Sequence, residues 1–301
     1  MKSAKDAHFW QVDHKIKKMA AVRHGVLMRS RDAWEKHSWT REYLGEKPKE
    51  GYFVWVREQP DGPLLTCVNI ATKNTRQKFR NLLVVEEGLK IELEGFCGNT
   101  EGCIKGYHRA SGKIIIKKNS SVKYKHVHAW EEESVVEPNY EFLLQENSSL
   151  DYVYKTSRTP KSLTVRNKIT CLKGAKVKLQ ILADCKNTRF TTEDEIVLQG
   201  EGSSGISRLR LIARKDSDIK ACSKIVAKSP SSGHLDCQSL VTDKNSRVTL
   251  VPEVVCEDKD AQITHEASIG KVSEEQLNYL RTRGLNEQQA INLITAGFLK
   301  V

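Results

Sequence analysis

Two adjacent side chains near the C-terminus, His265 and Glu266, are the first residues whose types suggest chemistry. An imidazole beside a carboxylate suits a metal site, a catalytic pair, or only the polar edge of a helical tail. A zinc protease motif needs a second histidine four residues on, and position 269 is Ile269. The sequence also contains no GxSxG elbow and no Gly-Lys-Ser/Thr phosphate loop. It therefore predicts neither a hydrolase of that kind nor ATP binding by this chain itself.

A second group of chemically capable residues lies in the run GHLDCQSLV, which contains His234, Asp236 and Cys237. Neighbouring side chains alternate faces in a strand, so Asp236 points away from Cys237. In a stacked solenoid a residue one coil later lies about 4.8 Å away, and His265 follows Cys237 by 28 positions. If the coils stack in register, this spacing brings the thiol, the imidazole and the Glu266 carboxylate into one corner. A strand cysteine that is only a small core residue stays the alternative.

The elements that must position these residues are indicated by a repeat between about residues 81 and 252. Apolar β-forming runs alternate with polar turns, as in LVVEEGLKIEL, IIIKKNSSVKY, FLLQENSSLDY, ITCLKGAKVKL, LIARKDSDIKA and LVTDKNSRVTL. The turn centres are separated by 31, 28, 27, 43 and 28 residues, and a further turn near Gly200 divides the long step; the centres are Gly88, Asn119, Asn147, Gly174, Ser217 and Asn245. No helical crossover is legible between the runs. A period near 28 therefore favours a β-solenoid, with an antiparallel sandwich as the alternative.

The two ends of the chain differ from this repeat. The basic stretch DHKIKKMAAVRHGVLMRSRDAWEKH is compatible with helix and predicts a helical N-terminal arm that ends near Pro48. Ser273 and Asn286 are N-caps for two short C-terminal helices, which are marginal alone and must dock on something. The predicted organisation is a helical N-terminal arm (1–50), a β-helix core (51–262) and a C-terminal helical segment (263–301).

The composition excludes several classes of protein. The chain has 301 residues, of which 39% are hydrophobic and 29% charged, as in globular proteins. No apolar run approaches the roughly 20 residues of a membrane span, and the N-terminus lacks a signal-peptide pattern, so we expect a cytoplasmic protein. Eight cysteines without a CxxC pair argue against a zinc ribbon and a disulfide framework. The net charge of +11 is spread along the chain without interleaved aromatic residues, so we expect no nucleic-acid partner.

The C-terminal segment HEASIGKVSEEQLNYLRTRGLNEQQAINLITAGFL resembles the C-terminal signature of the SufB/SufD proteins, the scaffold subunits of the SUF iron–sulfur cluster assembly system. The run GHLDCQSL is similar to the preceding strand in shorter members of that family. The resemblance is strong over residues 233–299 and extends as a repeat pattern back to about residue 65. It implies a right-handed parallel β-helix, a homodimer in a minimal two-component system, and a SufC-like ABC ATPase bound through the C-terminal helices.

The resemblance also implies a metal site. It places a transient iron–sulfur cluster, of the 4Fe-4S type, at a subunit interface, with Cys237, His265 and Glu266 as ligands and Cys256 in reserve. Thiolates bind iron and sulfide firmly, whereas imidazole and carboxylate hold a cluster less firmly. Mixed ligation therefore suits a site that must release its product.

Two positions depart from the pattern of the long SufB form. Ser246 stands where that form has a cysteine, and Thr264 stands where it has a glutamate. The expected function is a scaffold without enzymatic activity, supplied by sulfur and iron donors, with ATP hydrolysed only by the partner subunit. A β-helix carbohydrate-active enzyme and a basic nucleic-acid-binding module are the alternatives.

Overall fold

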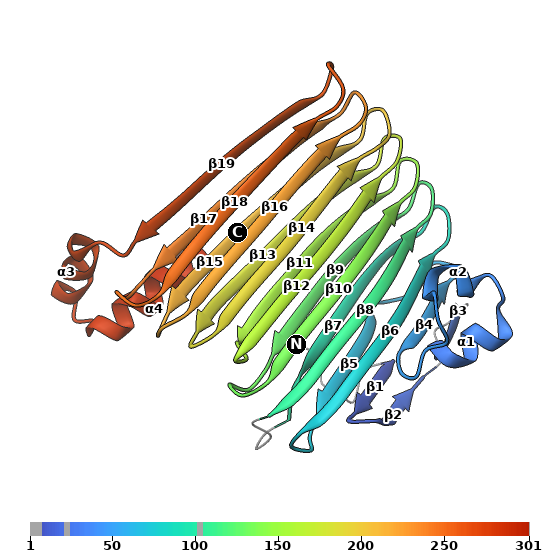
Figure 1. Ribbon diagram of the computed structural model, residues 1–301, viewed down its shortest axis with the longest axis horizontal. Helices are drawn as coiled ribbons and strands as arrows, with labels where there is room; N and C mark the ends of the chain where they lie inside the picture. The colour runs from blue at the N-terminus through green and yellow to red at the C-terminus, as the bar shows by residue number, and fades with distance from the viewer. Residues whose placement is uncertain (1–7, 21–24, 101–104, 301) are drawn as a thin grey trace.

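The computed structural model describes residues 8–20, 25–100 and 105–300. These residues form two facing sheets that are wound into an elongated parallel β-solenoid, with short helices at both ends (Figure 1). The ten-stranded sheet has the order β19-β17-β15-β13-β11-β9-β7-β5-β1-β2, and the nine-stranded sheet has the order β18-β16-β14-β12-β10-β8-β6-β4-β3. Successive strands of the solenoid thus alternate between the two sheets.

The first sheet contains β1 (Phe9–Val12), β2 (Lys15–Met19), β5 (Leu64–Ile70), β7 (Lys90–Asn99), β9 (Ser121–Ala129), β11 (Ser149–Arg158), β13 (Lys176–Lys186), β15 (Ser204–Arg214), β17 (Ser232–Val241) and β19 (Gln262–Lys271). The second sheet contains β3 (Gly25–Arg29), β4 (Tyr52–Val56), β6 (Thr75–Val85), β8 (Gly106–Ile116), β10 (Val135–Leu144), β12 (Ser162–Cys171), β14 (Arg189–Leu198), β16 (Asp218–Ala227) and β18 (Arg247–Cys256).

The register of the strands confirms the predicted solenoid. Ser121 is level with Ser149, 28 positions later in the chain, and their hydroxyls are hydrogen-bonded at 2.9 Å. In the other sheet Arg166 is level with Glu193, 27 positions later. The strands from β5 to β19 pair with one another in parallel, which excludes the antiparallel sandwich for the repeat region.

The turns between the strands stack as well. Four of the predicted turn centres have a positive φ, namely Gly88, Asn119, Asn147 and Gly174. In the additional turn predicted near Gly200, the residue with positive φ is Gly202. The N–H of Asn147 donates to the carbonyl of Lys173 at 2.9 Å, and the N–H of Gly174 donates to the carbonyl of Glu201 at 2.9 Å. Left-handed backbone at Asn and Gly is inexpensive, so the turn residues fix where each coil bends.

A continuous apolar core fills the space between the two sheets. Inward-facing side chains alternate with outward-facing polar ones along each strand, as the patterns of β11, β12 and β14 show. The core extends from Phe9 to Cys237, and Tyr124 stacks on Tyr152 within it at 4.9 Å between ring centroids. The outward positions carry ion pairs between successive coils, such as that between Arg166 and Glu193.

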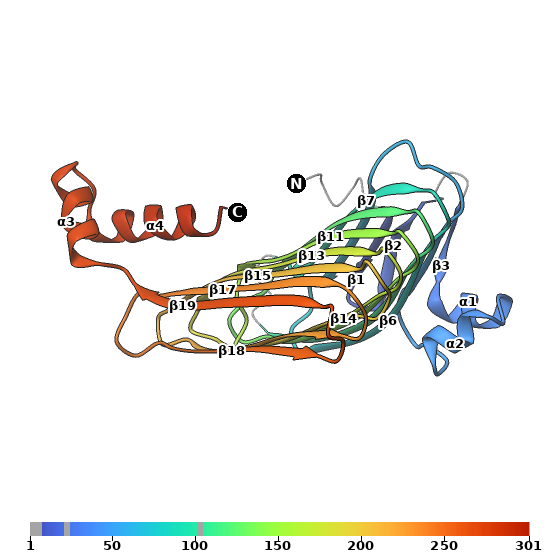
Figure 2. The same ribbon diagram turned by 90° about the horizontal axis from the view of Figure 1, so that it is seen from above.

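The N-terminal segment differs from the predicted helical arm. Its described part contains the strands β1, β2 and β3 as well as two short helices, α1 (Ser30–Lys36) and α2 (Thr40–Leu44). Strand β1 pairs with β5 and β3 pairs with β4, so both extend the solenoid. The helices pack outside the nine-stranded sheet, where Ala33 and Leu44 meet Phe53 and Leu82 (Figure 2). The first coil of the solenoid offers unpaired backbone N–H and C=O groups, which favour pairing with further strands. This pairing outweighs the helix-compatible composition of the N-terminal segment.

The C-terminal segment also begins later than predicted. Strand β19 contains residues 263–271, so helix begins only at α3 (Glu274–Thr282), which is followed by α4 (Glu287–Phe298). The predicted caps are confirmed: the side chain of Ser273 accepts from the N–H of Gln276, and Asn286 forms a capping box. Arg214 Nη1 donates to Asn292 Oδ1 at 3.0 Å and ties α4 to β15. In the described ranges, neither these helices nor any other is long and apolar enough to cross a membrane.

Candidate functional site

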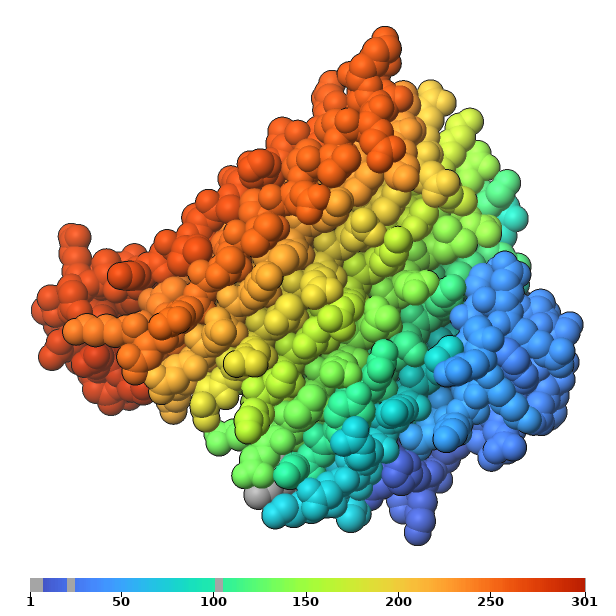
Figure 3. Space-filling view, viewed as in Figure 1, coloured from blue at the N-terminus to red at the C-terminus, as the bar shows by residue number. Residues whose placement is uncertain are grey.

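The predicted ligands lie at or next to the C-terminal edge of the solenoid. β18 and β19 are the last strands of their sheets, and each pairs with a neighbour on one side only among the described residues. This edge runs along one side of the molecule, away from the N-terminal segment (Figure 3). Inward-facing side chains of the last coil lack a further coil to cover them, and Ile269 is 51% exposed. An open sheet edge with exposed apolar side chains is a template for pairing with another chain.

Cys237 lies one strand inside this edge. It sits in the middle of β17 with its side chain in the core, where it is 2% exposed. Burial raises the pKa of its thiol to about 12, and the nearby carboxylates of Asp194 and Asp236 add to this rise. The thiolate is the form that binds metal. Cys237 is therefore not ready to ligate iron while the coil stays closed.

The position of His265 differs from the prediction. His265 is level with Leu235 and not with Cys237. The step between the two strands is 30 positions, as from His234 to Thr264, against 28 from β15 to β17, because the turns before and after β18 are each one residue longer. The prediction that His265 and Cys237 share one rung is therefore wrong. Register partners keep the same face, so the two side chains project from the same face of the sheet, two positions apart along the strands.

Glu266 and Cys256 lie on other surfaces than the sheet face that Cys237 and His265 share. Glu266 is level with Asp236 on the outer face, and its carboxylate lies 4.0 Å from His234 Nε2. Cys256 is the last residue of β18, in the opposite sheet, and is exposed. In the part of the chain that the structure describes, a single group of three or more His, Cys, Asp or Glu side chains brings its donor atoms within 4.8 Å of one another. It contains none of the four predicted ligands, so these do not converge within one chain.

An ion-pair cluster that was not predicted from the sequence holds the backbone beside Cys237. The carboxylate of Asp236 accepts from Arg208 Nε at 2.9 Å, and from Arg210 Nη1 at 2.8 Å and Nη2 at 2.6 Å. Burial raises the pKa of Asp236, but the two guanidinium groups outweigh this and hold it below its usual 3.8. The cluster anchors β17 to β15 on the outer face. The alternation of side chains along a strand predicted that Asp236 points away from Cys237. Its two arginine partners could not be predicted in this way, because they belong to another coil.

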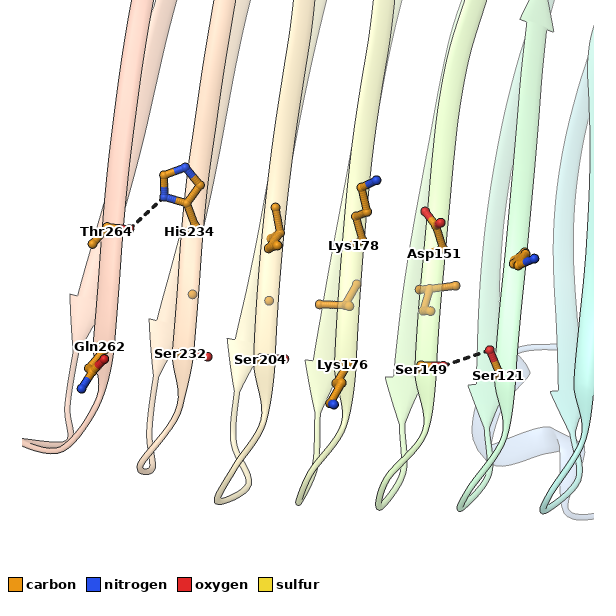
Figure 4. A pocket seen from close by; sticks show the side chains of 16 residues that line it. Ser121, Ser149, Asp151, Lys176, Lys178, Ser204, Ser232, His234, Gln262 and Thr264 are labelled. Carbon is orange, nitrogen blue, oxygen red and sulfur yellow. Dashed lines mark hydrogen bonds between the residues drawn. The ribbon is translucent and has the colours of Figure 1, made fainter. Parts of the chain in front are cut away.

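A shallow groove of about 720 Å³ crosses the outer face of the ten-stranded sheet near the beginning of its strands (Figure 4). It reaches the edge strand at Thr264, whose hydroxyl is hydrogen-bonded to His234 Nδ1 at 2.8 Å. Asp151 supplies the one carboxylate among the lining residues. Glycosidases generally place two carboxylates around the bond they cleave. The groove therefore does not support the carbohydrate-active alternative.

The group of ligand-type side chains that does converge consists of Cys97, His126 and His128 in the core. These three residues are not among those predicted from the sequence. A signal was present, because His126 and His128 alternate with Val127 and so share one face of a strand. Cys97 lies 29 positions before His126, close to the coil period.

Comparison with known proteins finds a matching family. The family described as SUF system FeS cluster assembly, SufBD core domain, matches residues 68–298. An iron–sulfur cluster assembly SufBD family protein of Methanothermobacter thermautotrophicus is 27% identical over 295 residues, which cover 89% of this chain and 72% of that protein. One from Archaeoglobus fulgidus is 25% identical and covers 100% of this chain and 86% of its own length.

A further relative is the iron–sulfur cluster assembly protein SufB of Bacillus subtilis, which is 24% identical over 83% of this chain and 55% of its own length. The family match includes most of the solenoid and both C-terminal helices. The chain belongs to the SufBD family of SUF iron–sulfur cluster assembly proteins.

Proposed function

We propose that this chain is the scaffold subunit of a SUF-type complex and that two copies build a transient iron–sulfur cluster, of the 4Fe-4S type, between them. The cluster is the cargo of the scaffold, not a resident cofactor. The open C-terminal edge is the observation that carries the proposal, because His265, Glu266 and Cys256 lie on strands with no outer neighbour among the described residues. The chain itself catalyses no reaction and works in the cytoplasm with separate donors of iron and sulfur.

A second copy supplies what one chain lacks. The four predicted ligands do not converge in a single chain, whereas two facing edges bring two sets of donors to one interface. The same contact would cover exposed apolar side chains of the last coil, such as Ile269 at 51% exposure. Covering apolar surface favours association, so the edge suits a homodimer.

An ATPase partner supplies the opening that Cys237 needs. The thiol is buried and protonated in the closed coil, and this chain has no phosphate loop with which to use ATP. Helices α3 and α4 present Tyr279 and Leu293, which are 60% and 55% exposed, and suit docking of a SufC-like ABC ATPase. Only residues 272–273 separate β19 from α3, so movement of the docked helices acts directly on the edge strand.

Anaerobic reconstitution with ferrous iron and sulfide tests the proposal. We expect the wild-type dimer to develop the visible absorption of an iron–sulfur cluster, and Cys237→Ala to lose it while remaining dimeric by light scattering. Cys171→Ala is the matched control, because it removes a buried, inward-facing thiol far from the edge. Full reconstitution by Cys237→Ala, or equal loss in both variants, would contradict the assignment of Cys237.

A further inference from the structure

We propose that Cys97, His126 and His128 form a second, interior site that binds one divalent transition-metal ion. The site lies between the sheets of the solenoid, on strands β7 and β9, and shares no residue with the C-terminal edge. It does not depend on the proposed cluster scaffold, because its ligands all come from one chain.

The geometry of the three side chains is that of an incomplete metal site. Cys97 is level with His128, and all three side chains are buried. Cys97 Sγ lies 3.5 Å from His126 Nε2, and the Nε2 atoms of the two histidines lie 3.0 Å apart. A Cβ at Gly95 would lie 2.9 Å from His126 Cδ2, so the glycine makes room for this imidazole. One thiolate and two imidazoles leave a fourth tetrahedral position open.

The hydrogen bonds around the group define its protons. Trp130 Nε1 donates to His128 Nδ1 at 3.1 Å, and an indole nitrogen can only donate. The proton of neutral His128 is therefore on Nε2, where it is donated to His126 Nε2. The proton of His126 must then be on Nδ1, which is buried and has no hydrogen-bond partner. In this tautomer the lone pair of His126 is on Nε2, the atom that lies beside Cys97 and His128.

A bound cation would rearrange this network in a defined way. The Cys97 thiol loses its proton to solvent and becomes a thiolate, which burial disfavours without a positive charge beside it. His126 already carries its proton on Nδ1, so its Nε2 lone pair is available to the cation. His128 transfers its proton from Nε2 to Nδ1, which then donates to the Tyr154 hydroxyl at 3.0 Å. The indole N–H of Trp130 then loses its acceptor, His128 Nδ1, so the fluorescence of this indole should change when the ion binds.

The donor set indicates which ions would bind. Thiolate with imidazole suits Zn²⁺, Fe²⁺ and Co²⁺, whereas Mg²⁺ and Ca²⁺ prefer oxygen ligands. Aromatic side chains enclose the group: His126 packs edge-on to Tyr140 and Tyr154 with centroids 5.4 and 5.8 Å away. A site so enclosed is best filled while the chain folds, because metal binding and folding are coupled.

Cobalt substitution tests the site. The full chain is refolded without oxygen in the presence of Co²⁺, and native protein is titrated with Co²⁺ in parallel. We expect one equivalent of cobalt with a thiolate-to-cobalt charge-transfer band, tetrahedral visible bands and a change in indole fluorescence. Cys97→Ala should lose the charge-transfer band, and His126→Ala should weaken binding by at least about tenfold. Cys185→Ala, which removes another buried core thiol, should leave the band intact.

Trp130→Phe distinguishes a metal site from a purely structural network. It removes the donor that competes for His128 Nδ1, so we expect cobalt affinity to increase by about tenfold. Cys237→Ala should retain the cobalt band, which separates this site from the cluster edge. Absence of the band from both wild-type preparations overturns the proposal, as does a band of full intensity in Cys97→Ala.

Discussion

The reactivity of Cys237 is a quantitative test of the closed coil. Burial raises the pKa of its thiol from 9.0 to about 12. Each unit lowers the thiolate fraction tenfold at pH well below both values, so the fraction decreases about 1,000-fold relative to the unfolded chain. The thiolate is the nucleophile toward an alkylating reagent. We therefore expect Cys237 to react about three orders of magnitude more slowly at pH 8 in the native protein than in urea.

The assay is a time course of iodoacetamide labelling read by peptide mass spectrometry. Cys171 is the matched control, because burial also raises its thiol pKa to about 12. If the ATPase partner opens the edge, adding it with ATP should accelerate labelling of Cys237 while Cys171 stays slow. Native labelling of Cys237 within tenfold of the urea rate would refute the closed coil. Equal labelling rates of Cys237 with and without the partner and ATP would refute only the proposal that the ATPase opens the edge.

Three further outcomes are expected. Burial raises the pKa of Asp194 to about 6 from 3.8, so its ionisation destabilises the fold as pH rises from about 4 to 6; Asp194→Asn should raise the free energy of unfolding by about 1–3 kcal/mol at pH 8 and by little at pH 4, measured in urea. Gly174→Ala should destabilise the fold more than Gly202→Ala in the same assay, although both positions have positive φ. A Cβ at Gly174 would lie 2.3 Å from Asn147 Oδ1, whereas a Cβ at Gly202 would lie 4.0 Å from its nearest neighbour and meet no clash. Deleting residues 272–301 should abolish capture of the ATPase partner while preserving the β-sheet circular dichroism, and retained capture would exclude α3 and α4 as the dock.

The solenoid could be predicted because the sequence features that specify it are local and recur in each coil. Each coil has its own apolar alternation and its own Asn or Gly turn, and the predicted steps of 27 and 28 positions appear again in the register of the strands. The N-terminal segment could not be predicted in this way. The run KIKKM suits a helix or a strand, and β1, with which it pairs, is held by the distant strand β5.

The sequence by itself determined the repeat, the helix caps at Ser273 and Asn286, and the family to which the signature belongs. Only the tertiary structure decided the site. One extra residue in each of the two turns beside β18 shifts His265 by two positions along the strand, because register depends on the length of every loop between two strands. The same stacking brings Cys97 beside His126 and His128, which no motif joins, because contacts across coils depend on how the whole chain winds.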